Sequence, residues 1–363
     1  ARLRGGVREK RIPKTKVAVI FGGISTEHDI SCKSADNVIK ALDGRFDLVL
    51  VGITREGQWL RYTGDAADVT AAWESHDVTP VALVPGMGAH AGGLFELVDG
   101  SLERIDVDVA LPVMHGQGGE DGTLQGTLET CGIPYVGCGV LASAACMDKD
   151  ASHRLAAAAG VRSPKCKVLY RGASEAEGQA AVEACGGFPV FVKPARGGSS
   201  IGVELPDTKE ELEQALRHLL AYGNHVVVEK KIHGREIQIA VLGDKYLPAV
   251  EIIPQGEFFD YVSKYQAGGA KEICPAPITD DEWKQVGEMA LALHRALGLS
   301  VYSRSDFILD DEGKAWCLEI NTLPGMTPTS LVPQEAAQVG LSYADLCEKI
   351  IHDSLEARKA AKL

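Results

Sequence analysis

The chain has 363 residues, 45% of them hydrophobic and 24% charged, a composition that suits a folded protein of two or three domains rather than a disordered or fibrous one. Its formal net charge of -13 argues against a nucleic-acid partner or an anionic membrane surface. No apolar run reaches the roughly 20 residues that cross a bilayer, and the basic residues 1–15 lack the apolar stretch of a secretory signal, so we expect a cytoplasmic protein without a membrane partner.

The first third of the chain predicts strands that alternate with helices. Short apolar runs stand at residues 16–21, 46–54 and 107–115, and residues 27–43 repeat apolar side chains at helical spacing. Runs of this kind, separated by helical stretches, are typical of a parallel sheet with crossover helices. We predict an N-terminal parallel α/β domain.

The middle of the chain has shorter elements. A helix that ends at Gly160 precedes two predicted strands around a Gly/Ser loop within residues 188–203. A helix with a capping box of Thr208 and Glu211 then leads to a strand at residues 225–232. These elements indicate a small central domain.

The last third predicts two hairpins, a long loop and a closing helix. Residues 236–252 form a hairpin candidate that turns at Gly243, and a capped helix leads to a second hairpin at residues 301–321. Between them, the polar segment at about residues 255–275 is too long and irregular for a turn, so we interpret it as a lid loop over a site.

These patterns divide the chain into an extension and three domains. The predicted boundaries are 1–15 for the extension, 16–143 for the N-terminal α/β domain, 144–226 for the central domain and 227–363 for the C-terminal domain. Nine cysteines are scattered over the three domains and never spaced as CxxC, so we expect reduced thiols and no zinc site.

The second C-terminal hairpin carries the strongest chemical signal. If its turn centres on Glu312-Gly313, Asp306 faces Glu319 and Arg304 faces Asn321, and the period of two along a strand puts all four side chains on one face. The flanking residues are apolar, so two carboxylates stand on an otherwise buried sheet, where an unneutralised charge is costly.

A divalent cation held by oxygen ligands would neutralise this face. Mg²⁺ with Asp, Glu, Asn and phosphate oxygens is the usual arrangement in enzymes that use ATP, so we predict a magnesium site. The alternative is a cross-strand salt-bridge cluster of Arg304 with Asp306 and Glu319 on a solvated face, and the hairpin on its own fits both.

The glycine-rich loop at residues 195–202 is a second candidate site. Its glycines let backbone N–H groups approach an anion, but it lacks the GK[ST] ending of a P-loop and the GxGxxG of a dinucleotide fold. Lys193, just before the loop, is a candidate partner for a nucleotide phosphate, and an ordinary solvated lysine at a strand end fits equally well.

Seven ordered sequence patterns extend from about residue 16 to the end of the chain. They are FGGISTEHDIS at 21–31, HGQGGEDGTLQG at 115–126, GIPYVGCGVLASAACMDK at 132–149, FVKPARGGSSIGV at 191–203, VVVEKKIHGRE at 226–236, DYVSKY at 260–265 and LEINTLPGMTPTSLVP at 318–333. Together they resemble the D-alanine:D-alanine ligases, which are members of the ATP-grasp superfamily.

The resemblance implies a three-domain α/β fold in which the central and C-terminal domains hold ATP between antiparallel sheets. It implies a reaction in two stages. One D-alanine carboxylate attacks the γ-phosphate of ATP to give an acyl phosphate, and the amine of a second D-alanine then displaces phosphate. The product would be the D-alanyl-D-alanine of peptidoglycan precursors, and the resemblance also favours a homodimer.

The resemblance assigns nucleotide and metal roles to matched positions. The Gly/Ser loop with Ser200 closes over the triphosphate, and the other nucleotide-binding residues are Lys149, Lys193, Glu229, Lys230, Ile232 and Glu236. Two Mg²⁺ ions, which Mn²⁺ can replace, bind Asp306, Glu319 and Asn321, and these are the oxygen ligands that the hairpin pattern also predicts.

The resemblance also assigns the site of the first D-alanine. Glu27 holds its ammonium, although a carboxylate at a helix N-terminus has a plain structural explanation. Ser199 and Tyr265 join Glu27 in a network that ties the lid over the substrates, and Lys264 contacts the transferring phosphoryl group. His115 lies nearby, at a strand end where a histidine is often just a surface residue.

Arg304 and the backbone N–H of Gly325 match the groups that stabilise the oxyanion, and Ser330 and Leu331 match the site of the second substrate's carboxylate. A non-catalytic ATP-binding relative would be expected to lose Arg304 or a metal ligand. A nicotinamide-dependent oxidoreductase is disfavoured because the GxGxxG fingerprint is absent.

Substrate choice within this family depends on few positions. Ligases that make D-alanyl-D-lactate lack the Lys-Tyr pair of the lid, whereas this chain has Lys264 and Tyr265. We therefore predict D-alanine as the second substrate, with D-serine or D-lactate as the alternative. The chain departs from the family at His153, where many members have lysine, and at Phe259, where tyrosine is frequent.

Overall fold

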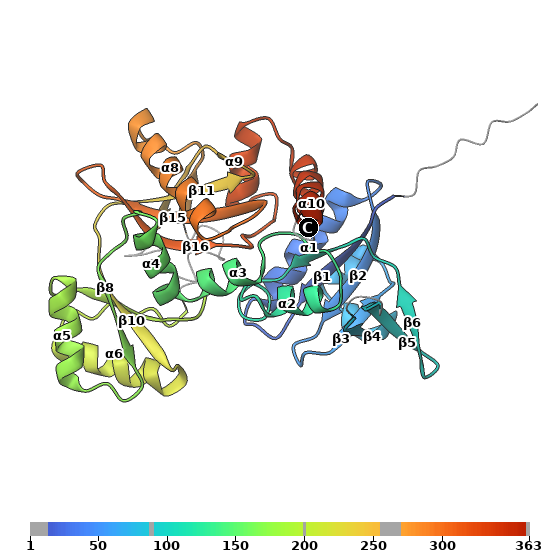
Figure 1. The fold of residues 1–363 in the computed structure, drawn as a ribbon, viewed down its shortest axis with the longest axis horizontal. Coiled ribbons are helices and arrows are strands. Elements are labelled where there is room, and N and C mark those ends of the chain that lie inside the picture. Colours follow the sequence, from blue (N-terminus) through green and yellow to red (C-terminus); the bar gives the residue numbers. More distant parts are fainter. Residues whose placement is uncertain (1–13, 87–90, 199–200, 255–269, 361–363) are drawn as a thin grey trace, which may run out of the picture.

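The computed structural model describes residues 14–86, 91–198, 201–254 and 270–360. Its sheets follow one another along the chain, so that the N-terminal part (blue to cyan), the middle (green to yellow) and the C-terminal part (orange to red) form separate masses in Figure 1. The chain is therefore an α/β protein with successive sheet-based units, as the sequence predicts.

The N-terminal sheet has the strand order β6-β5-β4-β3-β2-β1-β7, and β1 pairs in parallel with both β2 and β7. Alternate residues of β1 enter different cores: Val17 and Val19 pack with helix α1, and Ala18 and Ile20 pack with helix α2. The elements are β1 (Lys16–Gly22), α1 (His28–Leu42), β2 (Asp47–Ile53), β3 (Trp59–Tyr62), β4 (Val78–Val84), β5 (Gly93–Val98), β6 (Ser101–Ile105), β7 (Val109–Val113), α2 (Thr123–Thr130) and α3 (Val140–Met147).

The remainder of this sheet corrects the prediction of a parallel N-terminal sheet. From β2 to β6, neighbouring strands are antiparallel. The connections give the reason: β5 and β6 are joined by Asp99 and Gly100, which both have positive φ angles, 49° and 79°. A two-residue turn of this kind makes a hairpin and leaves no room for a crossover helix.

The central sheet is antiparallel, with the order β8-β10-β9, and helices α5 and α6 pack on it through an apolar core that includes Val182 and Leu212. Of the two strands predicted around the Gly/Ser loop, the second is reduced to an isolated bridge of Glu204 with Val192. The elements are α4 (Lys149–Ala158), β8 (Cys166–Tyr170), α5 (Glu175–Cys185), β9 (Val190–Pro194), α6 (Lys209–Tyr222) and β10 (His225–Lys230).

Two predicted helix caps can be compared with the structure. The capping box of α8 is complete, because Thr279 and Glu282 bond reciprocally. The box of α6 is half formed: the Thr208 hydroxyl accepts from the Glu211 amide at 3.2 Å, but the Glu211 carboxylate accepts from the amide of Asp207. Both helices nevertheless begin where the sequence pattern predicts.

The C-terminal sheet has the order β14-β13-β11-β15-β16, with β12 paired to β11. Its first hairpin turns at Gly243 as predicted, because Leu242 pairs with Lys245. Helix α8 packs on one face of this sheet. The elements are β11 (Arg235–Leu242), β12 (Lys245–Tyr246), β13 (Val250–Pro254), β14 (Ala270–Ile273), α8 (Asp280–Ala296), β15 (Tyr302–Leu309), β16 (Ala315–Asn321), α9 (Leu331–Gln338) and α10 (Tyr343–Ala360).

Helix α10 returns from the C-terminal sheet to the N-terminal one and lies beside α1 (Figure 1). Leu346 and Ile350 of α10 share an apolar core with Val38 and Leu42 of α1. At the edge of this contact, Arg45 forms an ion pair with Asp345 at 2.8 Å. The first and last parts of the chain are therefore packed against each other.

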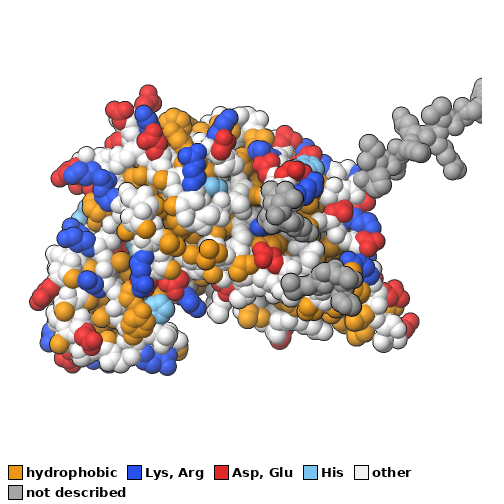
Figure 2. All heavy atoms as spheres, viewed as in Figure 1, with side chains coloured by type: hydrophobic (Ala, Val, Ile, Leu, Met, Phe, Trp, Pro, Cys, Tyr) orange, Lys and Arg blue, Asp and Glu red, His pale blue; other side chains and the backbone are white. Residues whose placement is uncertain are grey.

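The surface and the helices agree with the composition. On the face drawn in Figure 2, the acidic and basic side chains of the described residues are interspersed over the surface. Within the part of the chain that the structure describes, no helix combines the length and the apolar character needed to span a membrane.

Candidate active site

Two cavities adjoin in the middle of the molecule. The larger, about 710 Å³, lies between α1, the loop after β7, the end of β16 and the start of α9. The smaller, about 500 Å³, lies between the central sheet and the C-terminal sheet. Gly197, Gly198 and Glu319 line both cavities, so a molecule in one cavity can touch a molecule in the other.

The smaller cavity has the character of a nucleotide site. Apolar side chains such as Ile252, Ile308 and Leu318 form part of its walls, and charged groups stand at its edges, a combination that suits a base and its phosphates. Every predicted nucleotide-binding residue that the structure describes lines this cavity, namely Lys149, Lys193, Glu229, Lys230, Ile232 and Glu236.

Glu229 is the most deeply buried of these residues, with 1% of its surface exposed. Its carboxylate accepts from the Lys193 ammonium at 2.6 Å and contacts the ring of His153 at 2.9 Å. Burial alone would raise the pKa of Glu229, but Lys193 and His153 outweigh it and lower that pKa to about 2. His153, which the sequence marks as a departure from the family, thus holds the Glu229 carboxylate in the wall of the smaller cavity.

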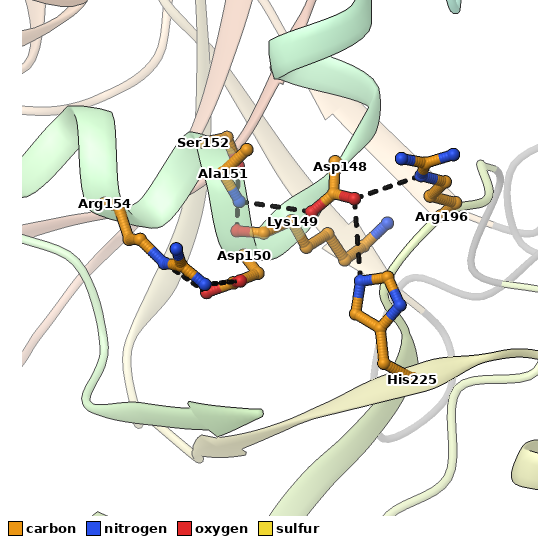
Figure 3. Close-up of polar contacts among 8 residues, drawn as sticks. All are labelled: Asp148, Lys149, Asp150, Ala151, Ser152, Arg154, Arg196 and His225. Atoms are coloured by element: carbon orange, nitrogen blue, oxygen red, sulfur yellow. Dashed lines mark hydrogen bonds and ion pairs between the residues drawn. The ribbon is translucent and has the colours of Figure 1, made fainter. Parts of the chain in front are cut away.

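The start of helix α4 holds the glycine-rich loop against this cavity. Asp148 caps the helix by accepting from the Ala151 amide at 3.1 Å, and its second oxygen accepts from Arg196 at 3.0 Å (Figure 3). The adjacent Lys149 donates its ammonium to the Gly197 carbonyl at 2.8 Å. The loop is therefore tied to the start of the helix at Asp148 and at Lys149.

The polar hairpin stands where the two cavities meet, and its register confirms the predicted pairs of Asp306 with Glu319 and Arg304 with Asn321. The main ion pair, however, runs along β15 rather than across the strands: Arg304 Nε and Nη2 lie 2.8 and 3.1 Å from the two oxygens of Asp306. Asn321 Nδ2 lies 3.3 Å from the same carboxylate. A bulge follows Asp306.

Arg304 is a fixed positive charge in this environment. Burial would lower the pKa of its guanidinium, but Asp306, Glu319 and Glu335 raise it above the ordinary value. Because Arg304 lines the larger cavity, it presents a permanent cation to whatever reacts there.

The larger cavity gathers the predicted amino-acid sites. The residues that line it and that the sequence assigned are Glu27, His115, Arg304, Glu319, Asn321, Gly325, Ser330 and Leu331. Glu27, at the start of α1, and His115, in the loop after β7, come from the N-terminal unit, and the others come from the C-terminal unit. The site is therefore built by the contact between the two units.

Glu27 and His115 are both buried, with 6% and 8% of their surfaces exposed. A Cβ added to Gly116 would lie 2.7 Å from Glu27 Oε2, so the carboxylate rests directly on the backbone at Gly116. Burial lowers the pKa of His115, although the Glu27 charge opposes this shift. Burial therefore favours a neutral imidazole at His115.

The start of helix α9 forms the far wall. Ser330 is its N-cap residue, and its hydroxyl accepts from the Thr327 amide at 3.0 Å. A Cβ on Gly325 would lie 3.2 Å from the Ser330 hydroxyl oxygen. The N-terminus of α9, with Ser330 and Leu331, thus faces the cavity beside Gly325, and a helix N-terminus attracts a carboxylate.

The structure adds site residues to which sequence reasoning assigned no role. Glu120 lines the larger cavity and belongs to the HGQGGEDGTLQG pattern, which was a usable signal. Glu335 on α9 is fully buried and accepts from the Ala240 amide at 2.6 Å. Burial raises the pKa of Glu335 well above its usual value, and Arg304 opposes the shift. No sequence pattern marks Glu335.

The predicted metal ligands fit Mg²⁺ by their chemistry. Asp306 and Asn321 are bonded to each other, and Glu319 stands opposite Asp306 at the wall between the cavities. Among the described residues, no group of three or more His, Cys, Asp or Glu could hold a metal ion. The two carboxylates and the amide of these residues suit Mg²⁺, which takes one or two carboxylates and completes its shell with water and phosphate oxygens.

The predicted roles of Ser199, Ser200, Lys264 and Tyr265 concern positions outside the described residues, as does most of the predicted lid loop at 255–275. Phe259 lies there as well. Their assignments stay predictions from the sequence.

Two protein-family models match this chain along most of its length. Residues 16–138 match the model described as the D-ala D-ala ligase N-terminus, and residues 155–352 match the model of the C-terminus. The D-alanine--D-alanine ligase of Caldicellulosiruptor bescii is 37% identical, covering 96% of this chain and 97% of its own length. That of Geobacillus kaustophilus is 38% identical, with 94% and 95% covered.

Solved structures of ligases are also similar to this chain. The VanG D-Ala:D-Ser ligase of Enterococcus faecalis has a TM-score of 0.85 and 38% identity, covering 94% of this chain and 99% of its own. The D-alanine-D-alanine ligase of Bacillus anthracis, complexed with ATP, has a TM-score of 0.72 and 31% identity, with 96% and 99% covered. The chain therefore belongs to the D-alanine--D-alanine ligase family and is an ATP-dependent ligase of the ATP-grasp fold.

Proposed function

We propose that this enzyme joins two D-alanine molecules to give D-alanyl-D-alanine, with ATP converted to ADP and phosphate, for the synthesis of peptidoglycan precursors. We also propose that it works in the cytoplasm as a homodimer. The observation that carries the reaction is the shared wall of the two cavities, Gly197, Gly198 and Glu319. It allows a phosphate in the smaller cavity to meet a carboxylate in the larger one.

The first stage is phosphoryl transfer. The carboxylate of one D-alanine, whose ammonium Glu27 holds, attacks the γ-phosphate of ATP, and the bond between the γ-phosphorus and the ADP oxygen breaks. Lys149 and Lys193 neutralise the phosphates, and Lys264 contacts the transferring group. Mg²⁺ held by Asp306, Glu319 and Asn321 would shield phosphate charge.

The second stage forms the peptide bond. The second D-alanine, with its carboxylate at Ser330, Leu331 and the N-terminus of α9, attacks the acyl carbon through its uncharged amine, and phosphate leaves. Arg304 and the Gly325 N–H stabilise the oxyanion of the tetrahedral intermediate. Ser199 and Tyr265 close the lid with Glu27, and the Gly/Ser loop with Ser200 covers the triphosphate, which keeps water from the acyl phosphate.

A second candidate reaction differs in the second substrate. The solved structure of VanG, a D-Ala:D-Ser ligase, has a TM-score of 0.85 and 38% identity with this chain, so its similarity leaves D-serine open. D-Lactate is the other alternative. These three substrates share a carboxylate and differ in the nucleophile or side chain that enters beside Arg304.

The test is phosphate release from ATP with D-alanine, and with D-alanine plus D-serine or D-lactate, with products identified by mass spectrometry. We expect D-alanine to suffice and D-alanyl-D-alanine to dominate in every mixture. A dominant mixed product would reassign the second substrate. The absence of phosphate release with all three amino- or hydroxy-acid combinations would refute the proposed reaction.

A further inference from the structure

Glu120 is a carboxylate that the proposed reaction leaves without a role. It lies in the loop after β7 and lines the larger cavity beside Glu27, His115 and Arg304. The Gly116 amide donates to Glu120 Oε2 at 2.7 Å. Among the described residues, this is the only hydrogen bond recorded for its side chain, so one oxygen holds the loop and the other is available to the cavity.

Glu27 and Glu120 both approach one residue, Gly116. The Glu27 carboxylate rests on the α-carbon of Gly116, where an added Cβ would be 2.7 Å from Oε2, and the Glu120 carboxylate accepts from the amide of the same Gly116. Gly116 has φ +71°, a conformation in which glycine is favoured. The loop thus brings two carboxylates together at the wall of the cavity.

Glu120 places a second acidic side chain at the cavity wall that holds Glu27. Burial, together with the charges of Glu27 and Glu319, raises the pKa of Glu120 to about 8, and Arg304 opposes this shift. Arg304 is already bonded to both oxygens of Asp306, so it does not supply a dedicated partner for Glu120. A bound cation between Glu27 and Glu120 would stabilise the charged form of both.

We propose that Glu120 is a second carboxylate, beside Glu27, that binds the ammonium of the first amino-acid substrate. This inference rests on the proposed function. An ammonium has three donors, and Glu27 alone leaves donors for a further acceptor. Glu120 offers one next to the same residue, Gly116, which would fix the orientation of the bound ammonium in the larger cavity.

The first site can be studied alone with hydroxylamine as the nucleophile. Hydroxylamine is uncharged near neutral pH and attacks an acyl phosphate, forming a hydroxamate while phosphate leaves. With ATP, D-alanine and hydroxylamine, the product is D-alanine hydroxamate, so D-alanine is needed at the first site only. The KM of D-alanine in this assay reports the first site, and the dipeptide assay reports both.

The variant is Glu120→Gln, which keeps an oxygen acceptor for the Gly116 amide and removes the charge. We expect the first-site KM for D-alanine to rise about 10- to 100-fold, as for loss of a hydrogen bond to a charged group, while the KM for ATP changes less than about twofold. The matched control is Asp121→Asn. Asp121 accepts from the amides of Gly118 and Thr123 in the same loop but is absent from the residues recorded as lining either cavity.

Three outcomes decide between the roles. A selective rise of the D-alanine KM in Glu120→Gln, absent in Asp121→Asn, supports the ammonium role. An unchanged KM, or equal losses for ATP and D-alanine in both variants, refutes it and leaves Glu120 as a loop cap. If the unaltered enzyme forms neither the hydroxamate nor the dipeptide from D-alanine, the proposed function fails, and the ammonium role fails with it.

Discussion

Arg304 chelates Asp306, two residues further along the same strand, through Nε at 2.8 Å and Nη2 at 3.1 Å from the two carboxylate oxygens. The side chains of residues two apart on a strand point to the same face, so this pair and Glu319 opposite it share one surface. The guanidinium is thereby fixed in orientation at the point where the two cavities meet.

Replacing Arg304 with lysine tests this fixed orientation. Arg304→Lys keeps a positive charge but loses the planar fork that chelates Asp306. We expect kcat for phosphate release to fall about 10²- to 10³-fold, the range for loss of one oxyanion donor. Arg154→Lys is the control, because Arg154 makes a similar bidentate pair with Asp150 on the exposed surface of α4. Comparable losses in both variants would contradict a specific role for Arg304.

Acid titration tests the buried Glu229. The pKa of Glu229 is lowered to about 2 from an ordinary value of 4.5, so its ion pair with Lys193 and its hydrogen bond with His153 contribute stability above pH 4.5 that is lost as the pH falls toward 2. We expect Glu229→Gln to reduce the free energy of unfolding by about 3 to 5 kcal/mol at pH 7, and the difference to shrink in acid. Urea unfolding between pH 3 and 7 measures both. A difference that stays constant with pH would refute the assignment.

Gly116 supports the Glu27 carboxylate. In Gly116→Ala the added Cβ meets Glu27 Oε2 at 2.7 Å, whereas Gly118→Ala, at a similar φ of +87°, meets nothing within 4 Å. Both variants incur the strain of a left-handed alanine, on the order of 1 kcal/mol, so the comparison isolates the clash. We expect kcat/KM for D-alanine to fall at least about 10-fold more in Gly116→Ala, since binding geometry near the reacting groups is sensitive to such shifts. Equal losses would show that Glu27 moves aside without consequence.

The Glu335 side chain accepts a hydrogen bond from the Ala240 amide, but its negative charge is unfavourable because the side chain is fully buried. Because its pKa is raised well above 4.5, the folded state prefers the protonated form, and stability declines as the pH rises from 4.5 toward that raised value. Glu335→Gln keeps an acceptor for the Ala240 amide and removes the titration, so its unfolding free energy should depend less on pH between 5 and 8. Glu335→Ala leaves that buried amide unpaired and should cost about 1 to 3 kcal/mol or more. Denaturant unfolding of both variants at pH 5 and 8 tests this, and identical behaviour of the two would contradict it.

The sequence predicted those parts of the site that follow from strand geometry. Asp306 faces Glu319 because a hairpin of known turn position has a fixed register. That Arg304 would bond along the strand to Asp306 could not be predicted, because a long side chain reaches its neighbours along the strand and across it alike. Which of these neighbours Arg304 bonds depends on how deeply each atom is buried in the folded protein.

Other features left weaker signals in the sequence. The antiparallel strands β3 to β6 are partly exposed and carry polar side chains, so they lack the continuous apolar runs that revealed β1 and β7. Glu335 stands next to Gln334 in a helix without a clear apolar periodicity. The sequence does not show that Glu335, rather than Gln334, is the buried one. The pairing of these strands and the burial of Glu335 both depend on contacts between segments that are distant in the sequence.

The packing of α10 against α1 affects the order in which the parts of the protein can fold during synthesis. Leu346, Cys347, Ile350 and Ile351 of the last helix belong to the same core as β1 and α1 at the beginning of the chain. During synthesis, the N-terminal unit is made first, yet its largest core stays incomplete until residues 343–360 have emerged. Domains generally fold as they are made, but here the earliest one must wait for the last, so a ribosome that stops short of α10 would release a chain with an exposed apolar face.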